Sequence, residues 1–223
     1  MNKELEKKLI EQVKKDPLVL DVIIDQTEKI CVEAVKHNGF ALKYVNDQTE
    51  AICIEAVKNK GNALQYVKHQ TEAICIEAIK QNSLSFNYVE HQTETICLEL
   101  VKQNGWAVNN VKHQTEAICL EAIKQDIFAL DYVKRQTDNI YKEALICNFN
   151  LAMNFIKIKQ KSTAMIVLEA SLQNNKNRII LTNIINKFNK DKEIANFYTK
   201  HKLWNYVDFN KLNNKLNHYA MTL

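Results

Sequence analysis

The chain has 223 residues, of which 46% are apolar and 25% charged, with a formal net charge of +4. This balance fits a folded soluble protein of one or two domains. With three glycines and one proline, the sequence has few of the turn-forming residues that β-rich folds and linkers need. No apolar run reaches the roughly 18 residues that could span a bilayer.

The first predicted element is a charged helix over residues 1–16, which we expect to cap the array that follows. Leu9, Glu11 and Val13 lie 22 residues before the equivalent positions of the first full repeat, so this helix is half a repeat unit. The opening stretch, MNKELEKKLIEQVKK, is charged throughout and is not expected to be a secretory signal.

From residue 17 the chain repeats with a period of 22 residues around the phrase QTEAIC. The threonine of this phrase recurs without a slip, at Thr27, Thr49, Thr71, Thr93, Thr115 and Thr137. A fixed period of this size indicates stacked structural units rather than one globular core. We therefore predict a helical repeat array over residues 17–170.

Each unit is expected to contain two short helices. In the unit that runs from Gly61, Thr71 is a suitable N-cap for a helix of about ten residues that ends near Gln81. Ile74 and Ala78 lie four residues apart in this helix and belong to a broad apolar stripe. A helix this apolar must contact neighbours on more than one side, as a helix inside a stack does.

A shorter helix is predicted before each threonine. Its first position is Gly61 in one unit but Pro17 and Ile127 in others. Because proline and isoleucine disfavour the left-handed conformation, this position does not require it. The position before it is Asn or Asp in all units except one, as expected of an N-cap. Lys60 is that exception, and we expect it to be the weakest cap.

Five of the six cysteines occupy the same position of successive repeats, at Cys31, Cys53, Cys75, Cys97 and Cys119. Neighbouring helices lie about 8–10 Å apart, whereas a disulfide needs Cα atoms within about 7 Å. We expect five buried thiols that act as small hydrophobic side chains in a reducing compartment.

The register of the array decays towards its C-terminal end. About four residues have been inserted between the pair Glu143-Ala144 and the related pair Glu169-Ala170. Residues 171–223 then carry nine Lys or Arg against three Asp or Glu, and their apolar periodicity predicts two or three amphipathic helices. We expect this segment to be a basic, Asn-rich helical cap over the last repeat.

The core phrase QTEAICLEAIKQ, followed by an A-L-x-Y-V segment, resembles a repeat family of unknown function that is abundant in giant DNA viruses of amoebae. The resemblance covers roughly residues 9–144 and at most extends to residue 170. It implies a viral protein made in a host cytoplasm. It implies no catalytic residues, because the family has no established activity.

The polar positions just before each Gln-Thr pair are the main candidate for a binding site. They would form a ridge along the array, and a solvated surface is its simplest interpretation. The functional alternative is a partner-binding ridge made of Lys68, His69, Glu90, His91, Lys112, His113, Lys134 and Arg135. No metal site is expected, because metal ligands lie about 2 Å from the ion while successive repeats stand about 10 Å apart.

One glutamine recurs in every repeat, at Gln26, Gln48, Gln70, Gln92, Gln114 and Gln136. A side-chain amide donates and accepts hydrogen bonds at once, so we predict a structural ladder of amides that links successive loops. A recurring glutamate two residues after each cysteine is interpreted as a solvated stripe. Translationally repeated carboxylates share one environment, whereas catalytic pairs need two different ones.

The basic C-terminal region is the rival candidate for function. Its lysines are interleaved with aromatic residues, a mixture that can bind single-stranded nucleic acid, although helical spacing of the aromatics favours a packed cap. The residues concerned are Lys187, Lys190, Lys192, Lys200, Lys202, Lys211 and Lys215, with Phe197, Trp204 and Tyr206.

Taken together, these patterns predict an all-α, right-handed αα solenoid of short helical hairpins with a helical C-terminal cap. The expected function is protein–protein interaction or scaffolding, without catalysis and without a cofactor. Two alternatives stay open: nucleic-acid binding through the basic C-terminal region, and a virion structural or self-assembling component. The expected location is the host cytoplasm or the virion, with no membrane association.

Overall fold

The computed structural model describes residues 2–174, 178–188 and 190–206. These residues form α-helices and 3-10 helices, and none of them lies in a β-strand. The chain divides into two compact units, Met1–Ala129 and Leu130–Leu223, which are described separately below. This division falls inside the predicted array, and the boundaries expected after residues 16 and 170 stay predictions.

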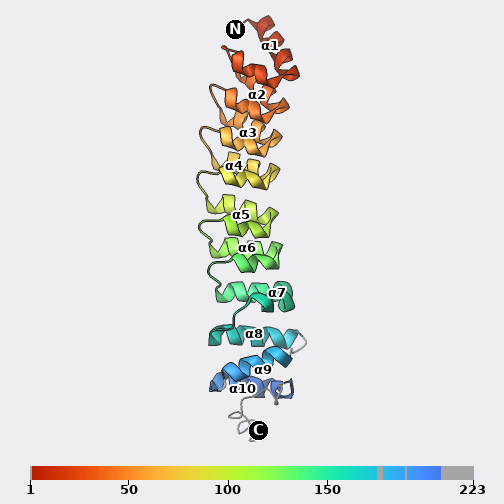
Figure 1. Ribbon diagram of the computed structural model, residues 1–223, viewed down its shortest axis with the longest axis vertical. Coiled ribbons are helices and arrows are strands. Elements are labelled where there is room, and N and C mark those ends of the chain that lie inside the picture. The colour runs from red at the N-terminus through yellow and green to blue at the C-terminus, as the bar shows by residue number, and fades with distance from the viewer. Residues whose placement is uncertain (1, 175–177, 189, 207–223) are drawn as a thin grey trace. The chain divides into compact units, whose positions relative to one another are not determined.

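The first unit is a helical repeat solenoid in which α-helices alternate with 3-10 helices (Figure 1). The α-helices are α1 (Lys3–Lys15), α2 (Glu28–His37), α3 (Glu50–Asn59), α4 (Glu72–Gln81), α5 (Glu94–Gln103) and α6 (Glu116–Gln125). The 3-10 helices are η1 (Pro17–Val22), η2 (Gly39–Tyr44), η3 (Gly61–Tyr66), η4 (Ser83–Tyr88) and η5 (Gly105–Asn110), and η6 (Ile127–Tyr132) follows α6.

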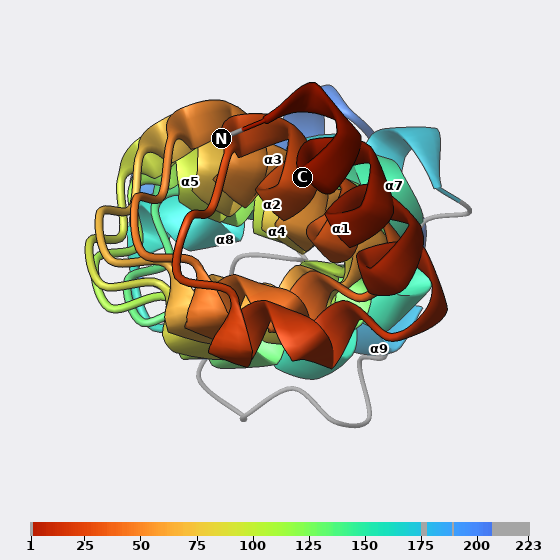
Figure 2. The ribbon, with the colours of Figure 1, turned by 90° about the horizontal axis from the view of Figure 1, so that it is seen from above.

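The α-helices form one layer of this unit and the 3-10 helices form the other, with the longer connections along one edge (Figure 2). Side chains from both layers meet between them. In one repeat, Ile74 and Ile79 of α4 are buried, and so are Ala63 and Leu64 of η3. This confirms the predicted all-α repeat fold, while the right-handed sense of the superhelix stays a prediction.

The α-helix of each repeat begins where the threonine predicts. Helix α4 begins at Glu72 and ends at Gln81, and the Thr71 hydroxyl accepts a hydrogen bond from the Ile74 N–H at 3.4 Å. Glu72 lies in the first turn and Lys80 in the last, where each charge suits the helix dipole. The helix is thus stabilised at both ends before any tertiary contact is made.

The first helix of each repeat is a 3-10 helix, which the sequence pattern did not distinguish from a short α-helix. Its six residues make about two tight turns, which is longer than most 3-10 segments, since these seldom exceed three or four residues. Asn82 caps η4 by accepting from the Leu84 N–H at 3.0 Å. Lys60 makes no such bond to η3, which confirms it as the exception among the caps.

The recurring glycines are explained by close packing rather than by backbone conformation, because none has a positive φ. A Cβ on Gly61 would lie 2.6 Å from the Ala78 carbonyl oxygen of the next repeat, too close for any side chain. At the following junction Ser83 replaces the glycine and Leu100 replaces the alanine. Helices α4 and α5 also stand further apart there than the neighbouring pairs do (Figure 1).

The second unit contains two longer helices, α7 (Asp138–Phe155) and α8 (Lys161–Gln173). They are followed by α9 (Arg178–Lys187), α10 (Lys192–Lys200) and the 3-10 helix η7 (Leu203–Tyr206). Helix α7 is broken at Asn148, which has extended backbone angles and accepts from the Leu151 N–H at 3.0 Å. Asn148 lies 22 residues after Asp126, at the cap position of the repeat. The repeat therefore persists, with an α-helical turn where earlier repeats have a 3-10 helix.

The last described helices pack through their apolar faces. Tyr198 of α10 is fully buried, and its hydroxyl donates to the Leu181 carbonyl oxygen of α9 at 2.5 Å. Lys161, at the start of α8, pairs with Asp191 at 3.2 Å and Glu193 at 2.5 Å. Across the described residues, no helix is both long and apolar enough to cross a membrane.

Candidate functional site

All eight residues of the predicted ridge are exposed, and they lie in the connections between a 3-10 helix and the next α-helix. Lys68, His69, Glu90, His91, Lys112 and His113 belong to the first unit, where these connections run along one edge (Figure 2). Lys134 and Arg135 occupy the same positions at the start of the second unit. We keep the name ridge for the six residues of the first unit.

The recurring glutamines fix the backbone of this ridge. The Gln48 side chain donates to the Leu42 carbonyl oxygen of its own repeat at 3.1 Å and to the Tyr66 carbonyl oxygen of the next repeat at 2.9 Å. Its amide oxygen accepts from the Lys68 N–H at 2.9 Å. One amide therefore ties two successive connections together.

The same bond to the residue 20 positions later recurs through the first unit. Gln26, Gln70 and Gln92 accept the N–H groups of Asn46, Glu90 and Lys112 at 2.9, 3.1 and 3.0 Å, respectively. The ridge side chains can therefore vary while their backbone positions stay fixed.

A second ladder runs between the threonines and the glutamates that open the α-helices. The Thr71 hydroxyl donates to Glu50 of the preceding repeat at 2.6 Å, and the Thr115 hydroxyl donates to Glu94 at 2.5 Å. Thr93 and Glu72 make the same contact. The sequence analysis did not single out these glutamates, although the fixed spacing of 21 residues between the partners was visible in the repeat.

None of the six cysteines, all within the described residues, forms a disulfide; the five repeat cysteines are buried and Cys147 is exposed. Burial raises the pKa of Cys53 and of Cys75 to about 11, with nearby carboxylates adding to the effect. Both groups therefore stay protonated at neutral pH, and the Cys75 thiol donates to the Gln70 amide oxygen at 3.5 Å. The thiols support the ladder as small apolar side chains with one weak donor.

The glutamates of the α-helices are partly exposed and pair locally with cations. Glu55 lies 3.2 Å from Lys58, and Glu33 lies 3.2 Å from His37. Exposed pairs of this kind contribute little to stability, about 0–1 kcal/mol each. Within the described part of the chain, no three His, Cys, Asp or Glu side chains come close enough together to hold a metal ion.

An exposed apolar stripe, which the sequence analysis did not single out, lies at the second position of the 3-10 helices. Leu84, Trp106 and Phe128 are 65%, 45% and 41% exposed. The Trp106 and Phe128 rings lie 6.2 Å apart, and the indole N–H donates to Asp126 at 2.5 Å. The 22-residue spacing of these large side chains was the signal that could have found it.

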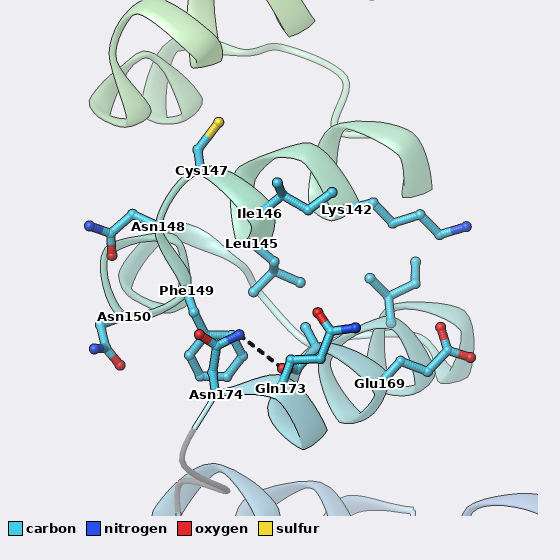
Figure 3. Close-up of a pocket in the computed structure, with 12 residues that line it drawn as sticks. Lys142, Leu145, Ile146, Cys147, Asn148, Phe149, Asn150, Glu169, Gln173 and Asn174 are labelled. Carbon is cyan, nitrogen blue, oxygen red and sulfur yellow. Dashed lines mark hydrogen bonds between the residues drawn. The ribbon is translucent and has the colours of Figure 1, made fainter.

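In the second unit a cavity of about 680 Å³ opens between α7 and α8 beside the break at Asn148 (Figure 3). Leu145 and Phe149 of α7 line it together with Glu169 and Gln173 of α8. Cys147 also borders it, but its sulfur points away from the cavity in Figure 3. Its lining mixes apolar and neutral polar groups with two charged side chains, Lys142 and Glu169.

The basic C-terminal region is only partly described. Lys187 donates to the Ile158 carbonyl oxygen at 2.5 Å, and the Phe197 ring stacks on His201 at 4.4 Å between centroids, so both side chains take part in packing. Lys190, Lys192, Lys200, Lys202 and Tyr206 are exposed. Lys211, Lys215 and the side chain of Trp204 lie outside the described residues.

The fold and its two ladders define a helical repeat protein of the solenoid class. One protein family matches the chain, over residues 27–70, and it is described as a domain of unknown function (DUF4116). The match covers two periods of the repeat. No curated protein and no solved structure matches the chain.

Proposed function

We propose that the chain is a non-catalytic interaction module that binds a protein partner along the ridge. The proposal rests on a difference between the positions that hold the repeats together and those that lie on the surface. The glutamine and threonine, which hold successive repeats together, are the same in every copy, whereas the first ridge position changes from repeat to repeat. Position 90 carries a glutamate where positions 68 and 112 carry lysines, so charge varies along a rigid backbone.

A rigid surface with variable side chains suits partner recognition, because little conformational entropy is lost when it binds. Extended surfaces of this kind are the usual binding faces of solenoids. Among the ridge side chains, Lys68 also bonds its own scaffold, through the Asn46 carbonyl oxygen at 2.8 Å. We propose that the ridge histidines and Glu90 are the side chains that contact the partner.

The experiment compares two triple variants of the full chain in affinity purification from host cells with quantitative mass spectrometry. The ridge variant replaces His69, Glu90 and His91 by alanine. The matched control replaces Lys80, Lys102 and Lys124, which are exposed in the last turns of α4, α5 and α6. We expect a reproducible partner to be lost from the ridge variant and kept by the control. Equal recovery by both variants would exclude the ridge.

The same proposal locates the protein in the host cytoplasm or the virion of a giant DNA virus. Five buried cysteines without disulfides support a reducing compartment, and the family match supports the repeat type. A self-assembling virion component would differ from a partner-binding module in solution, because its light scattering would rise with its own concentration. Scattering that stays constant over a wide concentration range would favour the interaction module.

A further inference from the structure

The glutamine ladder is interrupted at the first repeat of the second unit. Gln136 keeps the bond to its own repeat, donating to the Leu130 carbonyl oxygen at 2.9 Å. In earlier repeats the glutamine oxygen accepts an N–H from the residue 20 positions later. Here that residue is Ile156, whose N–H donates instead to the Ala152 carbonyl oxygen at 2.9 Å within the longer α7. The inserted residues have therefore separated two connections that elsewhere are tied together.

A cavity of about 680 Å³ lies at this interruption. Gln136 lines it, and so do the residues on either side: the connection before α7 and the extended segment between α7 and α8. Its size falls within the range of small-molecule sites, about 300–1,000 Å³. It is separate from the cavity of Figure 3, which opens beside Asn148.

The cavity is lined by more cations than anions. Lys134 and Arg135 come from the first connection, and Lys157 and Lys159 come from the second. Asp131 and Asp138 are the two carboxylates among its lining residues. Of these cations, Arg135, Lys157 and Lys159 are exposed and form no ion pair with any described residue. Such a lining favours a ligand with negative charge.

The start of α8 adds backbone donors to these cations. Gln160 is the N-cap of this helix, but its side chain makes no capping hydrogen bond, and both Gln160 and Thr163 line the cavity. The first N–H groups of a helix lack partners within the helix and carry partial positive charge. A phosphate group beside them would satisfy both the backbone and the cations.

Two aromatic side chains complete the lining, Tyr141 and Phe155, and both are partly buried. Tyr141 occupies the position that holds a cysteine in five earlier repeats, so a ring replaces a small side chain here. Burial, followed by the charge of Asp138, raises the pKa of Tyr141, so its hydroxyl stays protonated and can donate. Aromatic rings beside phosphate-binding groups are the combination that holds a nucleobase.

We propose that the cavity bounded by Arg135, Lys159 and Tyr141 binds a small phosphate ester of the nucleotide type. The phosphate lies against Arg135, Lys157, Lys159 and the first turn of α8, and the base lies against the ring of Tyr141. Arginine is suited to this role because its fork of N–H donors matches phosphate oxygens in pairs. The site is independent of the ridge, because it lies wholly in the second unit.

The test is isothermal titration calorimetry of the full chain at low ionic strength with adenosine monophosphate, ribose 5-phosphate and inorganic phosphate. We expect adenosine monophosphate to bind more tightly than ribose 5-phosphate, and both to weaken as salt is added. The double variant Arg135→Gln/Lys159→Gln should weaken binding about tenfold or more, since charged hydrogen bonds are lost. The control Lys80→Gln/Lys124→Gln removes the same charge from α4 and α6 and should leave the affinity unchanged.

A second variant tests the base. Tyr141→Cys restores the residue of the other repeats, which the fold accommodates at five equivalent positions. It should lower the affinity for adenosine monophosphate to that of ribose 5-phosphate while leaving the latter unchanged. Equal affinity of the unmodified chain for all three probes would show a general anion site and overturn the nucleotide assignment. Loss of binding in the Lys80/Lys124 control, or no binding of any probe, would overturn the site itself.

Discussion

Replacement of Gln48 by alanine tests how strongly the amide ladder holds neighbouring repeats together. The substitution removes hydrogen bonds to the Leu42 and Tyr66 carbonyl oxygens and from the Lys68 N–H, all between 2.9 and 3.1 Å. Each contributes about 1 kcal/mol net. Since the site is half-buried and water replaces part of the loss, we expect about 2–3 kcal/mol of destabilisation, which lowers the melting temperature by roughly 4–12 °C for a chain of this size.

The assay is urea unfolding followed by far-UV circular dichroism, with Gln65→Ala as the matched control. Gln65 is exposed, and its amide bonds the Asn62 carbonyl oxygen within the same 3-10 helix at 2.9 Å. The control should change stability by less than about 0.5 kcal/mol. Equal shifts of the midpoint for Gln48→Ala and Gln65→Ala would refute the reasoning, because the inter-repeat bonds would then contribute nothing beyond a local contact.

Three further predictions concern the caps, the glycines and the thiols. Lys60→Asn supplies the missing cap of η3 and should raise stability by about 1 kcal/mol in the same urea assay; an unchanged midpoint would contradict it. Gly61→Ala should destabilise the fold by about 1–3 kcal/mol through the clash with the Ala78 carbonyl oxygen, measured by thermal melting; an unchanged melting temperature would show that the repeats separate freely. Iodoacetamide at neutral pH should modify Cys147 alone, as read by mass spectrometry of the native protein, and equal labelling of Cys75 would show that α4 opens readily.

The raised thiol pKa values also set a pH dependence. Burial holds the pKa of Cys31, Cys53 and Cys75 at about 11, against 9.0 for an unperturbed thiol. The unfolded chain therefore releases these protons first, so stability is fully present below about pH 9 and falls between pH 9 and pH 11. Cys53→Ala should lessen this alkaline loss in urea titrations over that range. The same loss in the variant would assign it to other groups.

The sequence predicted the features that depend on local chemistry. Thr71 as a cap and Lys60 as a missing cap follow from hydrogen bonds within one turn, and both are confirmed. The role of Gly61 could not be predicted, because it depends on the distance to the next repeat rather than on its own φ angle. The sequence also could not show that the first helix of each repeat is a 3-10 helix, since six residues are too few for the apolar pattern to distinguish it from an α-helix.

The candidate sites show the same limit. The exposure of the ridge could be predicted because polar residues recur at the same positions of each repeat. The hydrogen bonds from glutamine to its backbone could be predicted because a side-chain amide both donates and accepts. The cavity beside Gln136 was not predicted, although the four-residue insertion and Tyr141 were both visible. An insertion tells where the stacking changes, but the space that it opens depends on how α7 lengthens.

The pairing of each glycine with the alanine 17 residues later has a consequence for how such an array gains or loses copies. Removal of residues 62–83 would bring Gly61 opposite Leu100, a partner too large for the close spacing. Removal of residues 79–100 would delete the same length and leave Gly61 opposite Ala78. Two deletions of the same length would therefore differ in their effect on stability. Tolerated deletions should be those whose end points keep each glycine opposite its own alanine.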